Sequence, residues 1–169
     1  MIADGFYRTS ELLYHEIAND LRRAITWTRS GSSDRLAYLP QLDGSYKLMI
    51  AYCLENMIKG CAIAANPALV QPEKVSSEIT NHNLHLLIRK IPLRWTSAEV
   101  ELLENLSECI VWLAKYPLPK DSSKLVESHG HSYQGLRKSF LEIYRKLTEY
   151  LQTFPSLNQH LHSYTYSRR

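Results

Sequence analysis

The sequence predicts an all-α protein, an up-and-down antiparallel helical bundle of four to five main helices. Three observations carry this prediction. Apolar residues recur every three or four positions in several long segments, which is the spacing of one helical face. No strand-like alternation runs far enough to compete with that spacing. The connections are mostly short, which favours antiparallel neighbours, and 169 residues suit one buried core.

The first two helices are indicated by their apolar stripes. We expect the first from about Ser10 to Thr28, before the polar stretch "RSGSSD". A short helical turn broken by Pro40 follows, and the second helix lies near 44–65, with Asp43 and Ser45 as possible caps. The stripe of the first is Leu13, Ile17, Leu21 and Ala24, and that of the second is Ile50, Leu54, Met57, Cys61 and Ala64.

The later helices have clearer ends. A short third helix is expected over residues 82–91, capped by Asn81 and ended by Pro92. The fourth begins at a capping box, "TSAE" at 96–99, and carries the seam Leu103, Leu106, Ile110 and Leu113 up to Tyr116-Pro117. The last runs over about 133–154 and buries Leu136, Phe140, Ile143, Leu147 and Leu151. Residues 1–155 therefore form one domain, and residues 156–169 form a basic tail.

Composition and charge indicate an ordinary globular protein of the cytoplasm. No secretion signal is visible, and the apolar runs are shorter than the roughly 18–20 residues that span a bilayer, so no membrane is expected. Cys53, Cys61 and Cys109 are expected to be buried, reduced thiols. Through Ala114 there are 11 Lys+Arg and 13 Asp+Glu, a net of −2, whereas from Lys115 onward there are 9 and 4, a net of +5. The C-terminal third is therefore the better surface for an acidic partner, nucleic acid included.

Three stretches resemble the HEPN superfamily, the higher eukaryote and prokaryote nucleotide-binding domain. They are "AYCLENMIKGCAIAANP", "ITNHNLHLLIRKI" and "TSAEVELLENLSECIVWLAKYPLP", and the resemblance covers residues 46–119. Where many members end the last of these in Arg-Tyr-Pro, this chain has Lys115. The resemblance implies a helical bundle and a prokaryotic defence, toxin–antitoxin or RNA-processing setting. We also expect the protein to be a homodimer.

Many members of that superfamily are metal-independent endoribonucleases with Arg-x(4–6)-His early in the last long helix. Here that helix carries Arg137, Lys138 and Arg145 without a histidine at the needed distance. The pair with fitting spacing is Arg8 and His15, at the other end of the chain. The leading hypothesis is therefore a binding or regulatory protein for RNA, a nucleotide or a partner protein. The alternatives are a divergent ribonuclease and a purely structural interaction module.

Candidate site residues follow from these hypotheses. His82 could act as a general acid or base with Lys115 or with the Arg8/His15 pair, or it could fix its loop to the helix by a hydrogen bond; we prefer the structural role. Tyr52, Glu55, Asn56 and Lys59 form a polar stripe, either a solvated face or a groove for RNA or a nucleotide, and Tyr116 is a further contact. The pairs His129/His131 and His160/His162 lack a completing ligand nearby, so neither metal nor cofactor is expected.

Overall fold

The computed structural model describes residues 2–28, 39–113 and 133–154, and these form an all-α fold, as predicted, with one short two-stranded sheet. The long helices are α1 (Ile2–Thr28), α2 (Leu39–Ala65), α5 (Ser97–Leu113) and α7 (Tyr133–Gln152). The short elements between α2 and α5 are η1 (Pro67–Leu69), β1 (Val70–Gln71), β2 (Lys74–Val75), α3 (Ser77–Thr80), α4 (Leu84–Leu87) and η2 (Ile88–Lys90). The two strands pair antiparallel, with Val70 opposite Val75.

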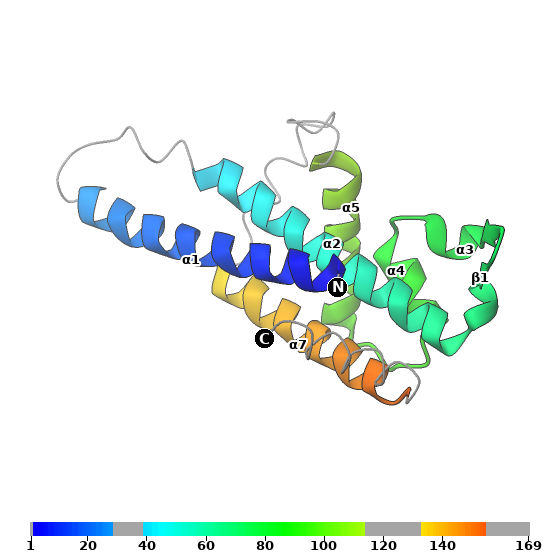
Figure 1. Cartoon of the computed structure of the whole chain (residues 1–169). Helices are drawn as coiled ribbons and strands as arrows, with labels where there is room; N and C mark the ends of the chain where they lie inside the picture. The colour runs from blue at the N-terminus through cyan, green and yellow to red at the C-terminus, as the bar shows by residue number, and fades with distance from the viewer. Residues whose placement is uncertain (1, 29–38, 114–132, 155–169) are drawn as a thin grey trace, which may run out of the picture.

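Helix α2 is the centre of the fold. It contacts α1, α4, α5 and α7. Figure 1 shows α1 and α2 running in opposite directions. In the same view α7 lies below α1, and α5 crosses α2. Because neighbours surround α2, residues on most of its circumference are buried, among them Tyr46, Ile50, Cys53, Leu54, Ile58 and Cys61.

The core confirms the predicted stripes of α5 and α7 except at Leu151, which is half-buried; the side chain of Leu113 lies outside what the structure describes. Leu103, Leu106 and Ile110 are buried, and the same holds for Leu136, Phe140, Ile143 and Leu147. Cys53 and Cys61 are buried thiols, as expected, whereas Cys109 is half-buried, so the expectation that it is buried was wrong. Burial raises the pKa of both Cys53 and Cys61 to about 12. These two thiols behave as small apolar side chains.

Two helices begin earlier than the sequence predicted. Helix α1 starts at Ile2 rather than near Ser10, because Ala3, Phe6 and Tyr7 already pack against the core. Helix α2 starts at Leu39 rather than near 44. Pro40 therefore lies in the first turn of α2. An N–H group there would have no carbonyl acceptor within the helix, so a proline does not interrupt it.

The start of α5 is the capping box that the sequence predicted. The Thr96 N–H donates to Glu99 Oε2 (2.7 Å), and the Glu99 N–H donates to Thr96 Oγ1 (3.2 Å). Lys146 of α7 adds a hydrogen bond to Glu99 Oε1 (2.5 Å) and lies 4.8 Å from the centre of the Trp95 ring. Burial alone would raise the pKa of Glu99, but the hydrogen bonds from Lys146 and Thr96 hold it below its ordinary value. The predicted cap thus also joins α5 to α7.

One described segment, Gly44–Ala65 of α2, is long and apolar enough to cross a membrane by length and composition. This differs from the expectation drawn from the sequence. It is weak support for a membrane segment, because the core helix of a soluble protein meets the same criterion.

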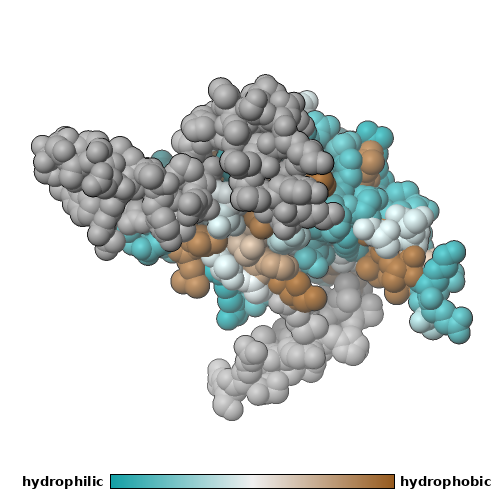
Figure 2. Space-filling view, turned by 90° about the horizontal axis from the view of Figure 1, so that it is seen from above, coloured by the Kyte–Doolittle hydropathy of each residue, from teal (hydrophilic) through white to brown (hydrophobic). Residues whose placement is uncertain are grey.

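Figure 2 shows apolar surface in several spots between hydrophilic side chains on one face of the molecule.

Candidate functional site

A buried carboxylate, a lysine and a histidine meet between α2 and the start of α4. Glu55 of α2 is only 5% exposed. Its Oε1 accepts hydrogen bonds from Lys59 Nζ (2.5 Å) and lies 2.9 Å from His82 Nδ1. Lys59 comes one turn after Glu55 on the same helix, whereas His82 reaches Glu55 from 27 residues away in the sequence. We call these three residues the Glu55 cluster.

The backbone around His82 is fixed by a serine of α5. The buried Leu84 N–H, in the first turn of α4, donates to Ser107 Oγ (2.8 Å). Ser107 Oγ in turn donates to Leu103 O (2.6 Å). Asn83 occupies the N-cap position, but its side chain makes no capping hydrogen bond. A side chain from α5 therefore performs the capping role at the start of α4.

This geometry corrects the predicted helix over residues 82–91. His82 precedes the helix, which is the short α4 followed by η2. Asn81 is not the cap, because its Oδ1 accepts from the Asn83 N–H (3.0 Å) in the turn before the helix. From the sequence we expected His82 to fix its loop to the helix that follows. The structure shows a hydrogen bond between His82 and Glu55 instead, which ties this loop to α2.

The charges of the Glu55 cluster determine what it can do. A buried carboxylate is costly unless it is paired, and Lys59 supplies the opposite charge. The contact with Glu55 favours a proton on His82 Nδ1, so that Nε2 of the neutral ring is the free base. The His82 side chain is 56% exposed, against 6% for Glu55 and 22% for Lys59. The cluster therefore presents an oriented imidazole to solvent above a buried ion pair.

The predicted polar stripe on α2 divides into two parts. Glu55 and Lys59 belong to the cluster. Tyr52 instead packs against Phe6 of α1, with ring centres 5.3 Å apart. The Asn56 amide donates to Tyr52 O (2.8 Å) within α2. The stripe is therefore not a solvated face, because α1 and the loop before α4 cover parts of it.

The other predicted residues do not join this cluster within the described part of the chain. Arg8 pairs with Asp4 one turn earlier (3.1 Å), and both side chains are mostly exposed. His15 is exposed on α1 and contacts the edge of the Tyr14 ring. Lys115 and Tyr116 lie outside the described residues, as do the two His-x-His pairs and the basic tail.

Several buried polar atoms near the cluster escaped the sequence reasoning. Glu55 Oε2, Asn83 Oδ1 and His85 Nδ1 are buried without a hydrogen-bond partner among the described residues. His85 Nδ1 also lies 3.9 Å from Glu104 Oε1 of α5. Native proteins leave few such atoms unpaired, and ordered water or a ligand commonly satisfies them. The sequence signal was the run of polar residues in "TNHNLH", which is dense for the start of a buried helix.

Comparison with known proteins gave no relative: no protein-family model, no curated protein and no solved structure matches this chain.

Proposed function

We propose that this chain is a HEPN-like helical binding protein, cytoplasmic and homodimeric, that holds RNA or a nucleotide at the Glu55 cluster in a prokaryotic defence, toxin–antitoxin or RNA-processing setting. One observation carries the proposal: Glu55, nearly fully buried, is hydrogen-bonded by both Lys59 and the exposed His82. The resemblance of residues 46–119 to the HEPN superfamily supports the choice of ligand.

The physical argument concerns cost. Replacing a buried ion pair by apolar side chains of similar size is often neutral or stabilising, so stability alone is a weak reason to bury Glu55. The exposed His82 imidazole can take part in a hydrogen bond, and the partly exposed Lys59 ammonium carries a positive charge. A phosphate group at the lip of the cluster would meet both side chains.

A second candidate is a divergent, metal-independent endoribonuclease, and the exposed side chain of His82, held through Nδ1 by Glu55, favours it. In that reaction Nε2 removes the proton of a ribose 2′-hydroxyl, and the 2′-oxygen forms a bond to the adjacent phosphorus. The bond from phosphorus to the 5′-oxygen breaks, and that oxygen takes up a proton from water, while Nε2 returns its own proton to the solvent. The products are a 2′,3′-cyclic phosphate and a 5′-hydroxyl. Glu55 would act as the residue that orients the base.

The test is incubation of the pure protein with mixed RNA, with and without EDTA, at neutral pH. RNA retention and RNA length are followed together. His82→Ala removes the exposed group, and His15→Ala is the matched control because it removes an exposed histidine from another helix. Glu55→Gln keeps the size of the side chain and removes its charge.

We expect intact RNA to be retained, and retention to fall in His82→Ala but not in His15→Ala. Cleavage that persists in EDTA and disappears in His82→Ala would mean that the protein is a ribonuclease and not only a binding protein. Absence of RNA retention at any low salt would leave a purely structural interaction module, because phosphate binding strengthens as salt falls.

A further inference from the structure

The Glu55 cluster holds acceptors that have no donor among the described residues. Glu55 is only 5% exposed, and its Oε2 is buried without a hydrogen-bond partner. Asn83 Oδ1, in the residue that follows His82, is also buried and unpaired. A buried acceptor without a donor is costly, and the cost is larger when the acceptor belongs to a charged group. The cluster therefore needs hydrogen-bond donors, and not further acceptors, to be complete.

The second oxygen of Glu55 shows how a donor could reach the carboxylate. Oε1 lies 2.5 Å from Lys59 Nζ and 2.9 Å from His82 Nδ1. The His82 side chain is 56% exposed, whereas the backbone two residues later is held by the bond from the Leu84 N–H to Ser107. The imidazole can therefore turn outward while its loop keeps its place. Once the ring has turned, each oxygen of Glu55 has a position for a further donor.

Lys59 determines which kind of donor suits these two positions. Its ammonium already supplies one positive charge to Glu55. An amine or a guanidinium from a ligand would place a second full positive charge beside the first, and the two would repel each other. Neutral N–H groups satisfy the carboxylate oxygens without this repulsion. The ligand group that fits is therefore neutral and carries two N–H donors.

Among the four RNA bases, guanine alone offers two neutral N–H donors side by side. Its N1–H and N2–H groups are parallel and match the two oxygens of a carboxylate, as the paired N–H groups of an arginine do. Adenine and cytosine present one amino group beside a ring acceptor. Uracil presents one N–H between two carbonyl oxygens. In these three bases an acceptor would face an oxygen of Glu55, and the two would repel each other.

We propose that the Glu55 cluster recognises guanine, in a free nucleotide or in RNA, through the two oxygens of Glu55. This inference rests on the proposed function and adds the identity of the base. The contact with the base would supply specificity, since base contacts carry the sequence information. The displaced His82 imidazole is then free to contact a phosphate group of the ligand.

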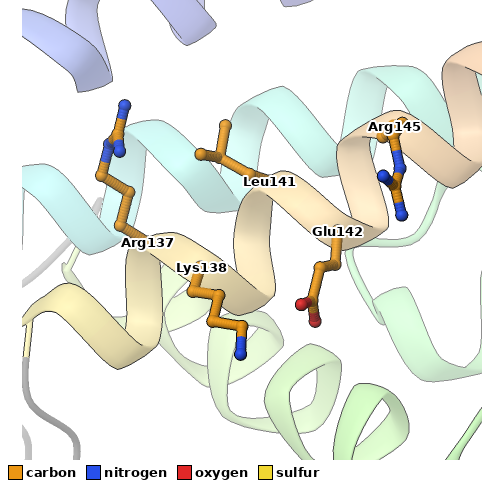
Figure 3. A pocket seen from close by; sticks show the side chains of 5 residues that line it. All are labelled: Arg137, Lys138, Leu141, Glu142 and Arg145. Atoms are coloured by element: carbon orange, nitrogen blue, oxygen red, sulfur yellow. The ribbon is translucent and has the colours of Figure 1, made fainter.

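Helix α7 supplies a control carboxylate away from this cluster. A shallow hollow of about 330 Å³ lies on its outer side (Figure 3), and the residues that line it are Arg137, Lys138, Leu141, Glu142 and Arg145. The guanidinium of Arg137 is already bonded to Glu11 of α1 (2.6 Å). The exposed charges of α7 alternate in sign along the helix, in the order Lys138, Glu142, Arg145 and Glu149. This side of α7 therefore shows no surplus charge for a ligand, and the exposed Glu142 serves as the control.

The first measurement compares GMP with IMP on the wild-type protein by isothermal titration calorimetry. Hypoxanthine, the base of IMP, keeps N1–H but lacks the 2-amino group, so the two ligands differ by one donor group. We expect GMP to bind about 10- to 100-fold more tightly, which is the effect of one hydrogen bond to a charged group. Because no variant is needed, this comparison does not depend on whether a mutant protein folds.

The second measurement separates RNA from the free nucleotide. Fluorescent oligouridines that carry one central guanosine, one central inosine or neither are compared by anisotropy, and we expect affinity to fall in that order. Glu55→Gln should bring guanosine and inosine to within about threefold of each other, because the amide has one acceptor oxygen instead of two. Glu142→Gln should keep the full preference. Circular dichroism verifies that both variants are folded.

The outcomes separate this inference from the proposed function. Equal binding of the guanosine and inosine oligonucleotides, with binding still lost in His82→Ala, overturns guanine recognition and leaves the proposed function in place. A preference for guanine that survives in Glu55→Gln overturns it as well. A preference for GMP without binding of any RNA supports the inference and identifies the free nucleotide as the ligand. Wild-type protein that binds neither nucleotides nor RNA overturns both proposals, and Glu55 Oε2 would then be paired with ordered water only.

Discussion

The hydrogen bond from Leu84 to Ser107 gives the sharpest test of how the site is built. Ser107→Ala removes the hydroxyl that accepts the Leu84 N–H, and this donor is buried. A buried donor without a partner costs about 1–3 kcal/mol. The other bond of Ser107, to Leu103 O, is worth little, because the helix backbone already uses that carbonyl. Alanine also returns about 0.5 kcal/mol of helix propensity.

Ser10→Ala is a matched control for this change. Ser10 is fully buried on α1, and its hydroxyl donates to Tyr7 O (2.7 Å), one turn earlier. No backbone N–H of another described element donates to Ser10. Both variants therefore gain helix propensity and lose a bond to a nearby carbonyl, but only Ser107→Ala strands a donor. The difference between their free energies of unfolding isolates the Leu84 bond at about 1–3 kcal/mol.

The assay is urea unfolding of wild type and both variants, followed by circular dichroism. Hydrogen exchange of the Leu84 amide gives a second readout, and it should speed up in Ser107→Ala. Equal destabilisation by the two variants would refute the assignment of Ser107 as the cap of α4. Unchanged protection of the Leu84 amide would refute it independently of the unfolding data.

Three further outcomes follow from the packing. Glu99→Gln should be less stable than wild type near neutral pH. Because the folded-state pKa of Glu99 is lowered, this difference in the free energy of unfolding is fully present above about pH 4.5 and fades as the pH falls below that value. Urea unfolding at several pH values measures it. Cys53 and Cys61, whose pKa burial raises to about 12, hold roughly a thousandfold less thiolate than free thiols at pH 8, so iodoacetamide labelling read by mass spectrometry should be slow until guanidinium is added; fast native labelling would contradict their burial. Phe140→Ala should lose about 3–5 kcal/mol of unfolding free energy, and a loss below about 1 kcal/mol would show that α7 does not pack as described.

Local signals made the helices predictable. The start of α5 was predicted correctly because all the atoms of the Thr96–Glu99 box come from four consecutive residues. The early start of α1 was missed although its signal was present. Ala3, Phe6 and Tyr7 continue the three-to-four spacing upstream of Ser10, and the tyrosine and the small alanine hid it.

The candidate site was only partly predictable, because its geometry depends on contacts between distant residues. The sequence indicated Glu55, Lys59 and His82 separately, as a polar stripe and a lone histidine. It could not show that a neighbouring helix covers Tyr52, nor that His82 reaches Glu55 across 27 residues. Ser107 carries no local mark at all, since a serine inside a helix is usually neutral, and its role follows from the position of Leu84 on another element.

The same two contacts also determine how the site could respond to a ligand. His82 is held to α2 through Glu55, and two residues later the chain is held to α5 through Ser107. The start of α4 is therefore fixed from two helices that cross in the core. A ligand that draws His82 away from Glu55 leaves a buried carboxylate paired with Lys59 alone, and this cost must be met by the ligand's own contacts. Binding would then be strongest for a ligand that brings donors for Glu55 as well as an anion for His82, and a nucleotide carries both.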